Sequence, residues 1–230
     1  MNKIKQQHYL NKEGLASYEL DFFFDVLLRR LGRELERLTD NIFYYEDESG
    51  NQRKPTVYED IFGLNEQAWV GLLNNAIIRS FPEADTLLEF TVYNGTKFHG
   101  RADLLVHWKN PQGESIYLLF EAKQFTDNTK GDYNDALNKT KDENYYDDIK
   151  NQVKNYIEAD KNYFSKKIIV IIPIIFGWIK DSSTLENAKK YMNKNEEKTE
   201  DFCSLYFEED RGAWVYGSVF NSKGEELINV

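Results

Sequence analysis

Asp103, Glu121 and Lys123 are the residues whose types and spacing could carry out chemistry. Side chains alternate between the two faces of a strand, so Glu121 and Lys123, two residues apart, would share one face. If the intervening turn is centred on Gln112, Asp103 lies nine residues before that centre and Glu121 nine after it. A symmetric hairpin would then place the two carboxylates opposite each other, on the face that also carries the lysine.

Two carboxylates beside a lysine are the groups that a hard cation and a phosphodiester require. Mg²⁺ prefers oxygen ligands and keeps several waters, so two carboxylates and a backbone carbonyl suffice to hold it. The lysine would bring positive charge close to an attacking water and to the phosphorus. The alternative is an exposed cross-strand ion pair that stabilises the sheet modestly. The register decides between them, because a one-residue slip would send Asp103 to the other face.

Two helices are predicted before these strands. Residues 18–38 carry leucine and phenylalanine at helical spacing, while Arg29, Arg33 and Arg37 line another side, which we interpret as solvated. A second helix is predicted over residues 65–80, with Asn65 as its N-cap.

After Pro82, apolar and polar residues alternate as they do in strands, and these strands contain Asp103, Glu121 and Lys123. They are predicted over residues 88–93, 98–108 and 116–125. In the last two, the face turned away from the acids would be entirely apolar and fit for a core, with Ala102, Leu104, Val106, Leu118, Phe120 and Ala122.

The rest of the chain completes an alternation of helices and strands. Residues 126–148 are polar and predict a loop or mobile insertion, and the continuous apolar character of residues 166–179 predicts a buried central strand. Helices are predicted over residues 144–163 and 183–195, and a terminal hairpin over residues 202–207 and 213–220.

This order predicts an α/β protein, a three-layer sandwich in which a central mixed sheet is flanked by helices. No linker divides the sequence, so we expect a single domain over residues 1–230 with its core at about 60–180. An extra N-terminal helical extension (1–59) and a C-terminal helix and hairpin (181–230) would flank that core.

The segments Gly100-Arg-Ala-Asp103 and Phe120-Glu-Ala-Lys123 together resemble the PD-(D/E)XK nuclease superfamily, which includes restriction endonucleases, resolvases and RecB-like exonucleases. The core of that superfamily is a helix, three antiparallel strands, a helix and a further strand, similar to the order predicted here over residues 65–179. The resemblance therefore implies a restriction-endonuclease-like fold. By the same resemblance Asp103, Glu121 and the Ala122 carbonyl would bind the metal, and Lys123 would be the catalytic lysine. The proline of the superfamily's name is absent, as it is in many members.

The superfamily often carries a glutamate on the helix before the sheet, reaching towards the metal. Glu66 precedes Trp69, Val70, Leu73 and Ile77 by three, four, seven and eleven residues, so it shares their inward face. The resemblance makes Glu66 a further metal ligand. The alternative is a first-turn glutamate favoured by the helix dipole.

Gln152 and Tyr156 resemble the Gln-x-x-x-Tyr motif of the RecB-like branch. Residues four apart face the same side of a helix, so both polar groups could point at the site and position the substrate backbone. Ordinary packing of a tyrosine beside a glutamine is the alternative.

Composition limits the partners and the compartment. The net charge of −10 counts against broad, non-specific affinity for DNA, since such affinity comes mainly from lysine and arginine contacts with phosphates. The N-terminus lacks an apolar core of signal-peptide length, and the run 168–179 is too short to span a bilayer as a helix. With a single cysteine, Cys203, the chain is expected to be cytoplasmic and to have no membrane partner.

The function expected from these residues is hydrolysis of phosphodiester bonds in DNA by a nuclease that depends on Mg²⁺ or Mn²⁺. Endonuclease and exonuclease activity are both compatible with the sequence, and RNA is a further candidate substrate. The alternative is a catalytically silent module of the same fold that binds nucleic acid or a protein partner. A homodimer is equally compatible with the sequence.

Overall fold

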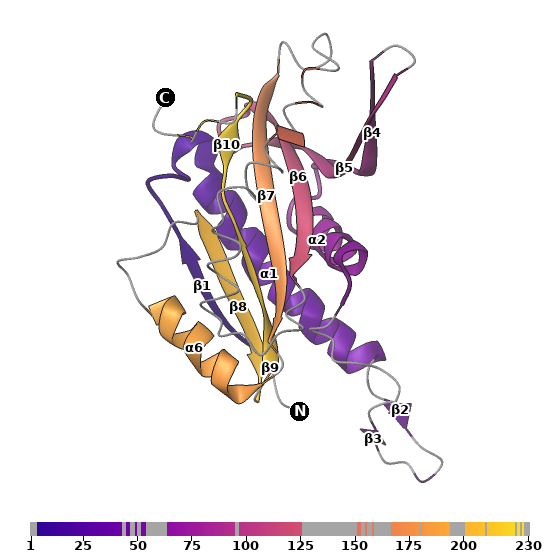
Figure 1. The fold of residues 1–230 in the computed structure, drawn as a ribbon, viewed down its shortest axis with the longest axis vertical. Helices are drawn as coiled ribbons and strands as arrows, with labels where there is room; N and C mark the ends of the chain where they lie inside the picture. The colour runs from indigo at the N-terminus through magenta and orange to yellow at the C-terminus, as the bar shows by residue number, and fades with distance from the viewer. Residues whose placement is uncertain are drawn as a thin grey trace.

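A computed structural model describes residues 4–42, 45–46, 49, 52–53, 64–94, 97–125, 151–152, 155, 158, 167–179, 181–193, 201–209, 211–223, 225 and 227. These residues form an α/β fold around an eight-stranded mixed sheet with the strand order β1-β8-β9-β7-β6-β5-β4, in which β10 also pairs with β7 (Figure 1). The strands are β1 (Lys5–Leu10), β4 (Asp85–Asn94), β5 (Lys97–Lys109), β6 (Ser115–Phe125), β7 (Ile168–Ile179), β8 (Phe202–Glu208), β9 (Arg211–Gly217) and β10 (Phe220–Asn221). A separate two-stranded sheet joins β2 (Tyr45–Glu46) to β3 (Gln52–Arg53).

The strands that carry the acids form an antiparallel unit followed by a parallel neighbour. β4 pairs with β5 and β5 with β6, both antiparallel, whereas β6 pairs with β7 in parallel. A parallel pair requires a long crossover between its strands. Most of the crossover lies outside the described residues, including the predicted loop over residues 126–148 and most of the helix predicted over residues 144–163.

Helices α1 (Leu20–Ile42) and α2 (Glu66–Ser80) cover one face of the sheet. In Figure 1, α1 crosses the strands obliquely. Asn65 caps α2 as predicted, because its side chain accepts a hydrogen bond from the Ala68 backbone N–H at 2.9 Å. The apolar stripe of α1 packs against α2 and the sheet, and the predicted stripe is fully buried at Leu20, Phe23, Phe24, Leu27, Leu28, Leu31 and Leu35.

Helix α6 (Ser182–Asn193) packs against the opposite face, beside β1, β8 and β9. Consecutive residues of β7 show the division, since Ile174 belongs to the core under α1 and α2 while Ile175 belongs to the core under α6. A strand buried on both faces explains why the sequence of β7 is continuously apolar instead of alternating.

Two predictions about the ends of the chain need correction. The N-terminal extension is not purely helical, because Lys5–Leu10 forms the edge strand β1, which pairs with β8. The strand predicted over residues 213–220 ends at Gly217, and Phe220 begins the separate strand β10 on β7. A Cβ atom at Gly217 would collide with the Pro173 carbonyl oxygen and the Phe202 ring, so close packing fixes this glycine.

None of the helices that the structure describes combines the length and the apolar character needed to cross a lipid bilayer.

A buried glutamate joins α1 to α2. Glu34 is 1% exposed, and its carboxylate lies 3.1 Å from Arg30 Nε, 3.0 Å from Arg37 Nε and 3.5 Å from Arg79 Nη1. Arg79 belongs to α2, so the carboxylate holds the two helices together. The predicted solvated arginine stripe is confirmed, since Arg29, Arg33 and Arg37 are all exposed, and Arg37 in addition pairs with Glu34.

Replacing Glu34 by Gln should destabilise the fold by about 2 kcal/mol, since it removes the buried negative charge that three neighbouring guanidinium groups share. Urea unfolding monitored by circular dichroism measures the loss. Glu36→Gln, on the same helix and partly exposed, is the matched control and should change stability by less than about 0.5 kcal/mol. Equal effects of the two substitutions would contradict the role assigned to Glu34.

Candidate metal centre

The predicted register between β5 and β6 is confirmed. Leu104 lies opposite Phe120 and Trp108 opposite Ile116, so the pairing is symmetric about Gln112. Asp103 and Glu121 are the next residues beyond the last pair of this ladder. From that point the described ladders pair β5 with β4 and β6 with β7. The two carboxylates therefore lie where β5 and β6 separate.

Asp103 bridges this separation through its side chain. Its Oδ2 accepts a hydrogen bond from the Ala122 backbone N–H at 2.6 Å, which gives that donor an acceptor beyond the end of the ladder. Burial raises the pKa of the Asp103 carboxyl above its usual value, although this hydrogen bond and the charge of Lys123 oppose the rise.

Glu121 is the most deeply buried acid of the site, with 1% of its surface exposed. Its Oε1 accepts hydrogen bonds from Lys123 Nζ at 3.1 Å and from Gln152 Nε2 at 2.7 Å. Its Oε2 is buried and has no hydrogen-bond partner in the described part of the chain. Burial, followed by the charge of Asp103, raises the pKa of Glu121 to about 7.

Lys123 lies between oxygen atoms of the site. Its Nζ donates to the Ala122 carbonyl oxygen at 2.9 Å as well as to Glu121. Burial alone would lower the pKa of Lys123, but the Glu121 carboxylate and the charges of Glu66 and Asp103 together outweigh it, so the pKa is raised and the ammonium form is favoured.

Glu66 reaches the site from the first turn of α2, as its predicted inward direction requires. Its Oε2 accepts a hydrogen bond from the Gln124 backbone N–H at 3.0 Å, and the Gln124 side chain donates to the Leu64 carbonyl at 2.6 Å. These bonds fix the start of α2 against the end of β6. The negative charge of Glu66 also contributes to the raised pKa values of Asp103 and Glu121.

Of the two residues of the Gln-x-x-x-Tyr motif, the structure places Gln152 at the site through its hydrogen bond to Glu121. Tyr156 lies outside the described residues, so its role stays a prediction.

The apolar face behind the acids is largely as predicted. Leu104, Val106, Leu118, Phe120 and Ala122 all belong to the core under α1 and α2. Ala102 was expected on the same face, but it packs instead in a cluster with Leu105, Leu119 and Ile171. Strict alternation along β5 therefore fails at Asp103, the residue at which β5 separates from β6.

The donor atoms suit a hard divalent cation. Asp103, Glu121 and the Ala122 carbonyl offer oxygen atoms, and the unpartnered Oε2 of Glu121 is a buried acceptor that a cation would satisfy. Among the described residues, no three side chains of the types His, Cys, Asp and Glu are grouped closely enough to hold a metal. Mg²⁺ would accordingly take its other ligands from the backbone and from water, which it commonly retains.

Sequence reasoning did not single out Glu89 on β4. The carboxylate of Glu89 contributes to the raised pKa of Asp103, so it is close enough to act on this site. The register of the β4–β5 hairpin would have predicted that Glu89 lies opposite Asp103. This register could not be predicted from the sequence, because the pairing shifts between Val92 and Tyr93.

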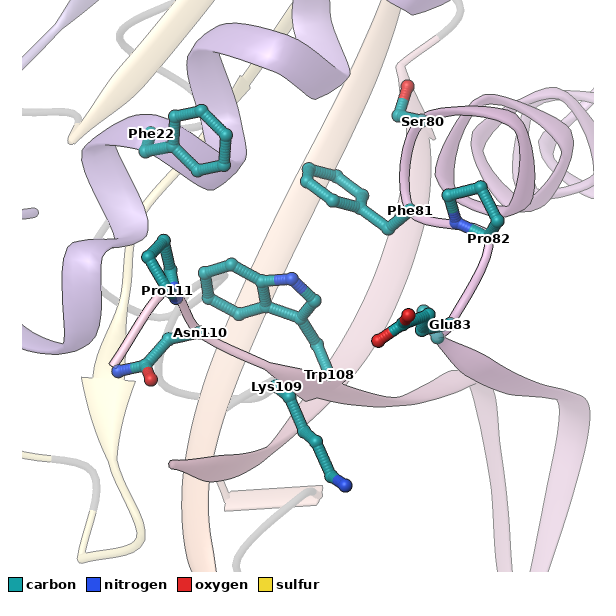
Figure 2. A pocket seen from close by; sticks show the side chains of 10 residues that line it. Phe22, Ser80, Phe81, Pro82, Glu83, Trp108, Lys109, Asn110 and Pro111 are labelled. Atoms are coloured by element: carbon teal, nitrogen blue, oxygen red, sulfur yellow. The ribbon is translucent and has the colours of Figure 1, made fainter. Parts of the chain in front are cut away.

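A cavity of about 350 Å³ lies at the other end of α2, away from the carboxylates (Figure 2). Ser80 and Phe81 at the end of the helix form one wall, and Trp108 forms another. Because Glu66 begins α2 and Ser80 ends it, the cavity and the acids are separated by the length of the helix, about 20 Å. The cavity is therefore not part of the candidate metal centre.

No protein-family model, curated protein or solved structure matches this chain.

The raised pKa of Glu121 predicts a pH-dependent stability. Because the folded-state pKa is about 7 against an ordinary 4.5, the folded protein retains this proton more strongly than the unfolded chain. The free energy of unfolding should therefore fall as pH rises from about 4.5 to 7 and then level off. Glu121→Gln removes the titrating group, so at pH 8 without divalent cations it should be more stable than the wild type by about 3 kcal/mol.

Urea unfolding of both proteins between pH 5 and 8, in EDTA, measures this difference. Stability profiles that stay parallel across the range would show that Glu121 is not responsible.

Proposed function

We propose that this chain is a metal-dependent nuclease of restriction-endonuclease-like fold that hydrolyses phosphodiester bonds in DNA. The proposal is supported chiefly by the buried Glu121 carboxylate, which has one unpartnered oxygen and lies beside Asp103 and Lys123.

The alternative of a stabilising surface ion pair fits this arrangement poorly. An exposed pair leaves its charges in water, whereas Glu121 is 1% exposed and carries a second acid, Asp103, close to it. Burying a carboxylate near another carboxylate destabilises a fold, and removing the charges would relieve that cost. Such groups with strongly shifted pKa values are characteristic of functional sites.

The arrangement of elements also supports the resemblance. Helix α2 precedes the antiparallel strands β4, β5 and β6, and β7 joins β6 in parallel after helical residues at 151–152. This is the order expected for the superfamily core.

Each residue has a distinct part in the proposed reaction. Asp103, Glu121 and the Ala122 carbonyl would hold Mg²⁺ or Mn²⁺ directly, and the predicted ligand Glu66 would reach the ion through one of the waters that it retains. When bound, the ion would supply Lewis-acid polarisation of the phosphodiester. The Lys123 ammonium would orient the attacking water and offset the negative charge that develops on the phosphate. Gln152 would hold the Glu121 carboxylate in a fixed orientation through its hydrogen bond.

A catalytically silent binding module is the second candidate function. The observation in its favour is the Lys123 ammonium, which already neutralises Glu121 and occupies the Ala122 carbonyl that would serve as a metal ligand. The net charge of −10 also fits a protein that makes its nucleic-acid contacts through a partner.

Incubation with single-stranded, duplex and branched DNA separates these functions. The wild type should cleave at least one of the three in Mg²⁺ or Mn²⁺ and none in EDTA. Asp103→Ala should abolish cleavage. Lys123→Ala should lower the rate by about a hundredfold or more while the protein stays folded and still binds metal. Glu186→Ala, an exposed acid on α6, is the control and should cleave normally.

A Lys123→Ala variant that cleaves as fast as the wild type would contradict the role of Lys123. Cleavage of RNA instead of DNA would correct the substrate alone. Absence of both cleavage and metal binding would favour the binding module.

A further inference from the structure

Glu89 lies across the β4–β5 ladder from Asp103. Leu88 pairs with Leu104 and Phe90 pairs with Ala102, so Glu89 and Asp103 are the two residues between these neighbouring pairs. The ladder is thus in register on both sides of Glu89, and the backbone of β4 brings this acid to the strand that carries Asp103.

The backbone at Glu89 is in a conformation that a glutamate rarely adopts. Its φ is 50°, in the left-handed region, within a strand whose other residues are extended. A non-glycine residue held in this region raises the energy of the fold, and such residues concentrate at functional sites. The strained backbone of Glu89, directly opposite Asp103, therefore indicates that the Glu89 side chain has a functional role at the candidate metal centre.

Two observations support a role for Glu89 in binding a cation. Glu89 stands opposite Asp103 in the β4–β5 ladder, so the backbone brings a second negative charge to the strand that carries this acid. Independently, Glu121 Oε2 is an acceptor on a side chain that is only 2% exposed, and it lacks a hydrogen-bond partner in the described part of the chain. An unpartnered buried oxygen with several negative charges around it is an arrangement that a divalent cation would stabilise.

We propose that Glu89 is a further acidic residue of the metal centre, which raises the affinity of the site for a divalent cation. This inference rests on the proposed function, because it assumes that Asp103 and Glu121 bind the cation. Glu89 is exposed, so it acts from the solvent side, through its charge and through water in the hydration shell that Mg²⁺ and Mn²⁺ retain.

Glu89→Gly should change thermal stability and metal affinity in opposite directions. A glycine tolerates positive φ, so Glu89→Gly should relieve the strain and raise the melting temperature. It also removes the carboxylate and should weaken cation binding. Glu89→Gln keeps a similar side-chain size and backbone preference, so it tests the charge alone.

Isothermal titration with Mn²⁺ tests the proposal on the whole chain, with thermal unfolding in EDTA as the second measurement. Glu89→Gln and Glu89→Gly should both bind Mn²⁺ roughly three- to tenfold more weakly than the wild type, the effect expected of one exposed charge near the site. The melting temperature should rise for Glu89→Gly only. Glu83→Gln, an exposed acid beyond the other end of α2, is the matched control and should leave both quantities unchanged.

The outcomes separate this inference from the proposed function. If the wild type binds Mn²⁺, Asp103→Ala does not, and Glu89→Gln binds like the wild type, the role of Glu89 is wrong while the metal centre stands. If the wild type does not bind Mn²⁺, both the inference and the proposed function fail. A melting temperature of Glu89→Gly at or below that of the wild type would contradict the strain at this residue.

Discussion

The buried carboxylate of Glu121 is the constraint on which the rest of the site depends. Removing this group from water disfavours its charged form, and the rise of its pKa to about 7 records that penalty. Lys123 and Gln152 offset part of the penalty by donating to one of its oxygens, and the other oxygen has no such donor among the described residues. Hydrogen bonds among the described residues therefore satisfy only one oxygen of the Glu121 carboxylate. A bound cation would satisfy the other.

The fold positions this carboxylate because the side chains of β6 alternate between an apolar face and a face that carries charged residues. Phe120 and Ala122 fill the core under α1 and α2, which leaves Glu121 and Lys123 on the other side of the strand. The β5–β6 ladder ends beside the acids, and at that point the Asp103 side chain accepts a hydrogen bond from the backbone N–H of Ala122. The same short stretch of β6, residues 120–123, thus packs the core and places the acids at the end of the β5–β6 ladder.

Periodic features of the sequence predicted much of this arrangement. The helices α1 and α2, the three antiparallel strands and the symmetric register of the β5–β6 hairpin follow from apolar spacing, an N-cap and a turn. Features set by tertiary contacts were missed. The segment Lys5–Leu10 is polar and becomes a strand because it pairs with β8, where Gln6 also bonds the Leu28 carbonyl of α1. The left-handed backbone of Glu89 likewise has no signal in its residue type, because glutamate does not favour positive φ.

Anomalous diffraction from crystals grown with Mn²⁺ would locate a divalent cation bound by Asp103 and Glu121. We expect an anomalous peak within about 2.0–2.5 Å of carboxylate oxygens from both residues, with Lys123 Nζ displaced from the Ala122 carbonyl. A peak elsewhere on the molecule, or none at saturating Mn²⁺, would contradict the metal centre and leave the acids and the lysine as an ion-pair cluster.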